Sequence, residues 1–248
     1  PISQWYVCPL AGVLASRLAS TRLRPWHVTV CGVVFLGLAT WRLADGAPMW
    51  GALLVWLAWC CDRLDGELAR TQESASRWGA WLDANVDEAG DIALHAGCAA
   101  CAAQLTGAAW PWALFTVFVG GKYLWQYGIR LEDEVAGVSL NLAQTPEPNV
   151  ESLPASPLER SKARGSLLRQ VVDFLGNADV RVHLLIGALA LAMPVVALAF
   201  AAFYFGARAS VRSFLVWRRL RRAADQAEHE TIGSHHAVVV DQSTKEAA

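Results

Sequence analysis

The stretch that decides the fold runs from Asp62 to Asp87 and reads DRLDGELARTQESASRWGAWLDANVD. Its four aspartates form two pairs, Asp62 with Asp65 and Asp83 with Asp87, whose i, i+3 and i, i+4 spacings place both carboxylates on one helix face. If the two segments are neighbouring antiparallel helices, the carboxylates converge on one pocket, and their like charges can coexist only beside bound cations. Because both flanks are strongly apolar, the stretch predicts a divalent-metal site within a membrane.

The composition of the whole chain also indicates a membrane protein. Of its 248 residues, 54% are hydrophobic and only 17% are charged, which is too apolar for an ordinary soluble domain. The net charge of -1 suggests no nucleic-acid partner. The six cysteines show no zinc-like pairing with histidines, and we expect them to be small buried hydrophobes.

Apolar segments along the chain predict an all-α, polytopic membrane protein with six transmembrane helices. An amphipathic helix within residues 1–24 is expected to lie in the membrane interface, and a proline at position 25 marks the break after it. The membrane domain, residues 25–214, holds the six spans, which are expected at 28–43, 49–68, 79–103, 110–127, 180–193 and 195–214. An even number of spans places both termini on one side of the membrane.

Two polar regions complete the predicted organisation. Residues 130–178 are polar, with four prolines between positions 146 and 157, and are predicted to form a cytoplasmic loop that ends in a short amphipathic helix near 166–175. Residues 215–248 are predicted to form a cytoplasmic tail. It is basic at first, and from Ala223 on it is polar without a clear period, which predicts disorder. Arg42 alone among the basic residues lies where the first two spans meet, so the positive-inside rule places the aspartates and both termini in the cytoplasm. The plasma membrane is the expected location.

The spacing of the central stretch resembles the signature of the CDP-alcohol phosphotransferase family, integral membrane enzymes that make phospholipids and some phosphorylated polyols. The pattern D-x-x-D-G-x-x-A-R-x8-G-x3-D-x3-D is met without a gap by Asp62, Asp65, Gly66, Ala69, Arg70, Gly79, Asp83 and Asp87. The resemblance implies transfer of a substituted phosphate from a CDP-alcohol, such as CDP-diacylglycerol or a CDP-polyol, to an acceptor alcohol with release of CMP. A solvated acidic loop between two helices, which is the other interpretation, needs no such regular spacing.

The resemblance also suggests roles for the aspartates. Cleavage of a pyrophosphate requires that charge on its oxygens be neutralised, and two divalent ions about 3.5 to 4 Å apart are a recurrent solution. Asp62, Asp65 and Asp83 are the predicted ligands, because carboxylates suit Mg²⁺ or Mn²⁺. By the resemblance, Asp87 also faces the metals and acts as the base that takes the proton from the acceptor hydroxyl.

Small residues and one arginine of the motif are candidate substrate contacts. Gly66, Ala69 and Gly79 would let a nucleotide approach the backbone closely, although tight helix packing in lipid explains small residues too. Arg70 is the natural phosphate contact, with an arginine that snorkels to the interface as the alternative. Glu67 is a weaker candidate.

Three further substrate contacts are suggested outside the motif. Thr29 fits an early Pro-Asn-x-x-Thr pattern of the family together with Pro25, but Trp26 replaces the asparagine. Lys122 could bind a phosphate of the acceptor or could snorkel to the interface. Arg130 lies near the cytoplasmic end of the fourth predicted span, where the family often has a segment with Tyr and Arg.

A polar stripe continues along the helix that carries Asp83 and Asp87. Asp91 and His95 follow at steps of four, so this face is polar for three turns. The two side chains could contact substrate or could hydrogen-bond to another helix, and the sequence favours neither.

A membrane divalent-cation transporter or a metal-binding structural protein is the alternative function, since carboxylates at membrane depth also mark ion paths. That alternative leaves the spacing of the small residues and Arg70 unexplained. Within the family, both a lipid and a polyol phosphate stay open as acceptor. Short spans with many small residues are compatible with a homodimer in the lipid.

Overall fold

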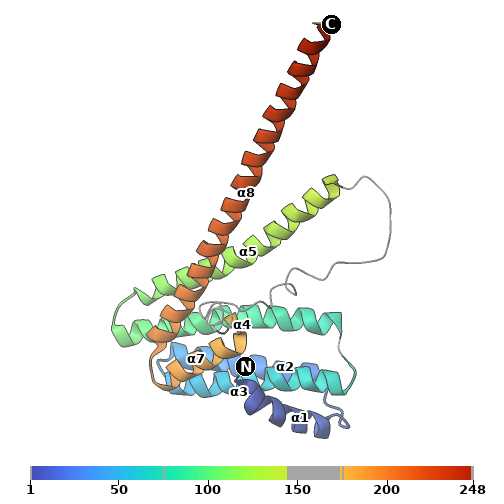
Figure 1. The fold of residues 1–248 in the computed structure, drawn as a ribbon. Coiled ribbons are helices and arrows are strands. Elements are labelled where there is room, and N and C mark those ends of the chain that lie inside the picture. The colour runs from blue at the N-terminus through green and yellow to red at the C-terminus, as the bar shows by residue number, and fades with distance from the viewer. Residues whose placement is uncertain (1, 75, 144–173, 175, 247–248) are drawn as a thin grey trace. The chain divides into compact units, whose positions relative to one another are not determined.

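The computed structural model describes residues 2–74, 76–143, 174 and 176–246, and its regular structure is helical. A short 3₁₀ helix, η1 (Ser3–Trp5), precedes the α-helices α1 (Val7–Leu18), α2 (Pro25–Ala44), α3 (Pro48–Thr71), α4 (Arg77–Thr106), α5 (Pro111–Ala143), α7 (Ala178–Ala190) and α8 (Pro194–Glu246) (Figure 1). These described ranges contain no strand, which confirms the all-α prediction. The chain forms two compact units, Pro1–Val119 with Glu147–Phe203, and Gly120–Pro146 with Tyr204–Ala248.

Prolines set the start of four helices, α2, α3, α5 and α8, which begin at Pro25, Pro48, Pro111 and Pro194. Proline is well tolerated in the first helical turn, because its missing N–H would have no intrahelical partner there and its φ is already helical. Each of the six predicted spans corresponds to one helix, with a start that differs by at most three residues, as 28 does from Pro25.

In the first unit, α2 packs along both α3 and α4 (Figure 1). A tight turn at Gly46 joins α2 to α3, so these two helices run antiparallel. Glycines let α4 approach α2 closely: Gly90 lies against Leu36, and a Cβ at Gly97 would lie 3.0 Å from the carbonyl oxygen of Thr40. These two contacts make α4 parallel to α2. The C-terminal half of α3 and the N-terminal half of α4 therefore lie at the same end of the three helices.

Two apolar clusters of buried side chains, both among the described residues, stabilise this arrangement. The larger one joins α2, α3, α4, α7 and the start of α8. Cys98 and Cys101 are buried in it, as predicted for the cysteines, whereas Cys8 and Cys31 are exposed. The smaller cluster fixes α1 against α2 and α3 at the end of the unit where α3 ends, and it consists of Ala15, Val28 and Leu68.

The outer face of α2 carries large apolar side chains: Val30, Val33, Val34 and Leu38 are 39 to 54% exposed. Within the described residues, two helices are long and apolar enough to cross a membrane, judged by length and composition, Pro25–Ala44 and Pro194–Arg222. The other four predicted spans stay predictions. Among them, α3 and α4 carry several charged side chains, and α7 has 13 residues.

Two helices extend further than the sequence analysis predicted. The loop was expected from residue 130, but α5 continues to Ala143, because this stretch holds no proline before position 146 to interrupt it. The tail was expected to be disordered, but α8 continues to Glu246; no proline follows Pro194, and residues 218–230 are rich in Arg, Ala, Glu and Gln, which favour helices. The short helix predicted near 166–175 lies outside the described residues except for position 174.

In the second unit, α5 and α8 cross at a pair of glycines. A Cβ at Gly121 would lie 2.7 Å from the backbone nitrogen of Gly206, so neither position leaves room for a side chain. Further along, Glu132 of α5 accepts from Arg212 of α8, and its Oε1 lies 3.3 Å from Nη1 of Arg219. This ion-pair network joins the two helices.

Candidate functional site

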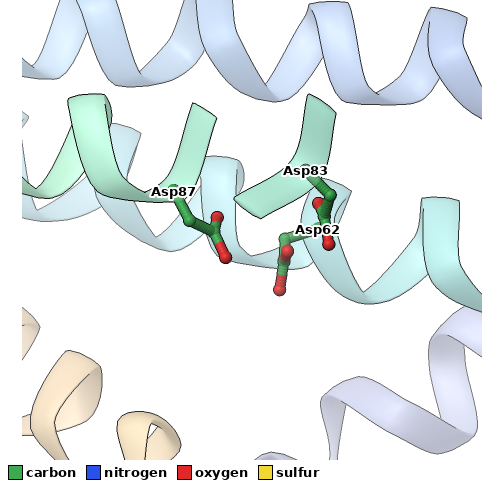
Figure 2. A group of neighbouring side chains, drawn as sticks. All are labelled: Asp62, Asp83 and Asp87. Atoms are coloured by element: carbon green, nitrogen blue, oxygen red, sulfur yellow. The ribbon is translucent and has the colours of Figure 1, made fainter. Parts of the chain in front are cut away.

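Three of the four motif aspartates come together where α3 ends and α4 begins. Asp62 of α3 and Asp83 and Asp87 of α4 each offer a carboxylate oxygen, and these oxygens all lie within 4.8 Å of one another. Figure 2 shows the three side chains turned toward a common region from the two helices. Asp83 and Asp87 share a face of α4 because they are one turn apart.

The chemistry of this group fits a divalent cation. Carboxylate oxygens are the hard donors that Mg²⁺ and Mn²⁺ prefer. Three negative charges this close together repel each other, and a bound cation would remove that repulsion. Asp62, Asp83 and Asp87 could therefore hold a metal ion together.

Asp65 lies apart from this group. Its Oδ2 accepts a hydrogen bond of 2.7 Å from Oγ1 of Thr29 on α2, and the residue is only 8% exposed. The sequence predicts four converging carboxylates, but the structure brings three together, and the fourth, that of Asp65, bonds to α2 instead. It also gives Thr29, a predicted substrate contact, a partner within the protein.

Thr29→Val is expected to destabilise the fold, because it leaves the buried carboxylate of Asp65 without this donor. A hydrogen bond to a charged group contributes about 1.5 to 3 kcal/mol, so the free energy of unfolding should fall by roughly that amount. The measurement is unfolding of the purified protein in detergent. Thr116→Val is the matched control, since the hydroxyl of Thr116 donates to the carbonyl oxygen of Trp112 on its own helix at 2.9 Å. Equal losses in both variants would contradict the expectation.

Arg70 and its neighbours form an exposed part of α3. The guanidinium of Arg70 donates to Oε2 of Glu67 at 2.5 and 3.2 Å, and the Arg70 side chain is 68% exposed. Among the described residues, a Cβ at Gly66 would meet only this guanidinium, at 3.7 Å. Ala69 is half-buried. The surface beside Gly66 is therefore not filled by a neighbouring helix.

The remaining predicted contacts lie on other elements. Gly79 belongs to the N-terminal cap of α4, where its N–H donates to Oγ of Ser76 at 3.0 Å. Lys122 and Arg130 lie on α5 in the second unit. Lys122 is only 7% exposed, with its Nζ 5.8 Å from the ring centroid of Phe205.

His95 and Asp91 contact each other. Nδ1 of His95 lies 2.8 Å from the carbonyl oxygen of Asp91 and 3.1 Å from its Oδ1, and the imidazole stacks on Phe118 of α5 with ring centroids 4.1 Å apart. His95 is 7% exposed. These contacts favour the structural interpretation of this pair over substrate contact.

Arg63 is a charged neighbour of the site that the sequence analysis did not single out. Its Nη2 lies 2.9 Å from Oδ2 of Asp62, and its guanidinium carbon lies 4.1 Å from the ring centroid of Trp59. The signal was available in the sequence, because Trp59 and Arg63 are four residues apart, the spacing at which a cation and an aromatic ring meet on a helix.

Comparison with known proteins adds an independent finding. A family model described as CDP-alcohol phosphatidyltransferase matches residues 22–149, slightly more than half of the chain. A phosphatidylinositol phosphate synthase of Mycobacteroides abscessus is 39% identical over 85 residues, which cover 34% of this chain and 39% of that protein. The protein of the same name from Mycolicibacterium smegmatis is 39% identical over 89 residues, or 36% of this chain and 40% of that one.

A more distant relative matches a longer stretch. The archaetidylinositol phosphate synthase of Pyrococcus horikoshii is 26% identical over 124 residues, which cover 50% of this chain and 62% of that protein. The chain thus spans about two fifths of the length of the two mycobacterial relatives that it matches.

Proposed function

The chain belongs to the CDP-alcohol phosphatidyltransferase family, and we propose that it transfers a substituted phosphate group from a CDP-alcohol to an acceptor alcohol and releases CMP. The observation that supports this most directly is the group of carboxylates from Asp62, Asp83 and Asp87, within 4.8 Å of one another on two helices. A pyrophosphate carries concentrated negative charge, and such a group of carboxylates suits the cations that its cleavage requires.

We assign the metal ligands and the base among the four aspartates. Asp62, Asp65, Asp83 and Asp87 are the proposed ligands of two Mg²⁺ or Mn²⁺ ions, with Asp65 turning from Thr29 to join the group. When bound, the ions neutralise charge on the pyrophosphate oxygens. Asp87 accepts the proton of the acceptor hydroxyl. The acceptor oxygen then bonds to the phosphorus that carries the donor's alcohol, and the bridging P–O bond breaks so that CMP leaves with its electron pair.

The donor is proposed to lie against α3 beside Gly66 and Ala69, where no described side chain of another helix fills the space at Gly66. Gly79 at the start of α4 has no side chain and would let the nucleotide approach the backbone closely. Thr29, Lys122 and Arg130 stay proposed substrate contacts, Lys122 for a phosphate on the acceptor.

Arg70→Ala is expected to raise the KM for the CDP-alcohol about tenfold or more, since a hydrogen bond to a charged group contributes roughly 1.5 to 3 kcal/mol. The stability should change little, because the Arg70 side chain is 68% exposed and its ion pair with Glu67 is a surface pair. Steady-state kinetics measure the KM, and thermal unfolding measures the stability. Arg77→Ala, which changes another exposed arginine, is the control. A loss of stability without a change in KM would make Arg70 an interface anchor instead.

The names of the relatives guide the choice of acceptor. Two are named as phosphatidylinositol phosphate synthases and one as an archaetidylinositol phosphate synthase. An inositol phosphate is therefore the acceptor that we propose first, with CDP-diacylglycerol as the donor. Other polyol phosphates and lipid alcohols form the rest of the panel.

We propose that α2, α3, α4, α5, α7 and α8 cross the membrane and that α1 lies in its interface. Support comes from the exposed apolar side chains of α2 and from Leu10, Val13 and Leu14 of α1, which are 38 to 53% exposed. From the distribution of basic residues, we propose that the aspartates and both termini face the cytoplasm. We propose the plasma membrane as the location. We also propose that the protein forms a homodimer in the membrane.

The experiment that tests the function measures CMP release by the purified protein. Candidate CDP-alcohols and acceptors are mixed with the protein in the presence of Mg²⁺, of Mn²⁺ or of a chelator. Release that requires metal, donor and acceptor together is the expected result. Metal binding without CMP release from any combination would overturn the proposal and favour a cation-binding or transport function.

A further inference from the structure

Arg63 lies directly beside the carboxylate group, and we infer that it is a positioning residue, held over Trp59, that fixes the carboxylate of Asp62 for metal binding. This inference depends on the proposed function only in that it takes Asp62 as a metal ligand. It concerns contacts of the first unit alone.

The immediate contacts of Arg63 restrict its guanidinium. Nη2 lies 2.9 Å from Oδ2 of Asp62, and the guanidinium carbon lies 4.1 Å from the centre of the Trp59 ring. The Nε of Arg63 is buried and has no hydrogen-bond partner among the described residues. The ring of Trp59 and the carboxylate of Asp62 therefore set the orientation of the guanidinium.

Trp59 is itself supported by α7 and by the start of the chain. The ring of His183 on α7 meets Trp59 edge to face, with centroids 6.4 Å apart and an interplanar angle of 88°. Nδ1 of His183 lies 2.6 Å from the carbonyl oxygen of Asp179, which can only accept, so Nδ1 carries a proton. In the neutral ring, Nε2 then accepts from the hydroxyl of Tyr6 at 2.5 Å. The carboxylate of Asp179 accepts from the backbone N–H of Ser3 at 3.0 Å.

These contacts connect the N-terminal segment to the metal ligand through three side chains. Tyr6 orients His183, His183 supports Trp59, and Trp59 supports Arg63. Partners that orient a metal ligand in this way typically change metal affinity by about 10- to 100-fold when they are removed. The competing interpretation is that Arg63 acts only as a cation that occupies Asp62 until a metal displaces it.

The two interpretations differ in the effect of changes that keep the charge. Trp59→Leu removes the ring while Arg63 keeps its charge. Arg63→Lys keeps the charge but loses the planar guanidinium with its fixed set of N–H donors. A positioning role predicts that each variant binds Mn²⁺ about tenfold more weakly than the wild type, and that Trp59→Phe, which retains a ring, stays close to the wild type. A competing cation predicts that both variants bind Mn²⁺ as tightly as the wild type or more tightly.

The experiment titrates Mn²⁺ into the purified full chain in detergent, without any CDP-alcohol, and follows free Mn²⁺ by electron paramagnetic resonance. Arg42→Lys is the matched control, because Arg42 also pairs with an aspartate, Asp45 at 3.0 Å, and also lies near a tryptophan ring, that of Trp41 at 5.8 Å, away from the site. Its Mn²⁺ affinity should not change. Thermal unfolding of each variant identifies any that fail to fold, and Arg63→Lys carries the test if Trp59→Leu is one of them.

Each outcome has a distinct meaning. Wild-type Mn²⁺ affinity in both Trp59→Leu and Arg63→Lys overturns the positioning role and leaves the proposed function intact. A wild-type protein that binds no Mn²⁺ overturns the metal site and the positioning role together. A wild type that binds Mn²⁺ but releases no CMP removes the proposed function, while a tenfold loss in the two variants still supports the positioning role.

Discussion

Asp83→Asn is expected to abolish transfer and to weaken divalent-metal binding, and Asp62→Asn should do the same. Each change removes a charged ligand from a group whose oxygens lie within 4.8 Å of one another. A metal ion contributes several kcal/mol to a charged transition state, and about 1.4 kcal/mol corresponds to a factor of ten in rate. The rate of CMP release should therefore fall by about 10³-fold or more.

The measurement combines the transfer rate at saturating substrate with Mn²⁺ titration of the same preparations. Asp45→Asn is the control, since Asp45 is an exposed aspartate paired with Arg42 at the turn between α2 and α3. That variant should retain both activity and metal binding. Near-normal turnover in Asp62→Asn or Asp83→Asn would eliminate the two-metal mechanism.

Asp65 provides an internal comparison for these variants. In the structure its carboxylate is held by Thr29 and lies outside the group of three. If it turns to the metals in the working enzyme, Asp65→Asn should lower Mn²⁺ affinity as Asp83→Asn does. If Asp65 stays bonded to Thr29, Asp65→Asn should lower the stability of the fold more than the Mn²⁺ affinity.

Much of the fold follows from local features of the sequence. The apolar segments and the prolines at 25, 48, 111 and 194 locate the helices, because both signals act within a few residues. The ends of α5 and α8 were harder to predict, since polar residues without proline fit either a loop or an exposed helix. The family prediction is confirmed by the family model, which matches residues 22–149. It could be made from the sequence because the motif lies within one stretch of 26 residues.

The site could be predicted only in part, because helical spacing gives the face of a residue but not its partner. Asp83 and Asp87 meet as predicted, since they share one helix. Asp65 also lies at the expected spacing from Asp62, but which of the two carboxylates bonds to Thr29 depends on how α2 packs against α3. The same holds for Trp59, whose contact with His183 joins segments more than one hundred residues apart.

Asp87→Asn is expected to lower transfer by about 10²-fold or more while metal binding persists. The neutral, isosteric side chain cannot accept the proton of the acceptor hydroxyl, and loss of a general base typically costs at least this factor. Its amide oxygen can still coordinate a metal. Asp87 lies in the same group of oxygens as Asp62 and Asp83, so it also has the position of a ligand. The test must therefore separate the base role from the ligand role.

The two roles of Asp87 separate in a metal titration of the transfer rate. If Asp87 serves only as a ligand, Asp87→Asn loses metal affinity and turnover together, and a raised Mn²⁺ concentration restores part of the rate, as it should for Asp83→Asn. If Asp87 is the base, its variant still saturates with Mn²⁺, and the maximal rate stays low at saturating metal because no carboxylate takes the proton. Asp83→Asn, measured in parallel, shows how a lost ligand behaves in this protein. Recovery of Asp87→Asn by added metal would exclude the base assignment and leave Asp87 as a ligand.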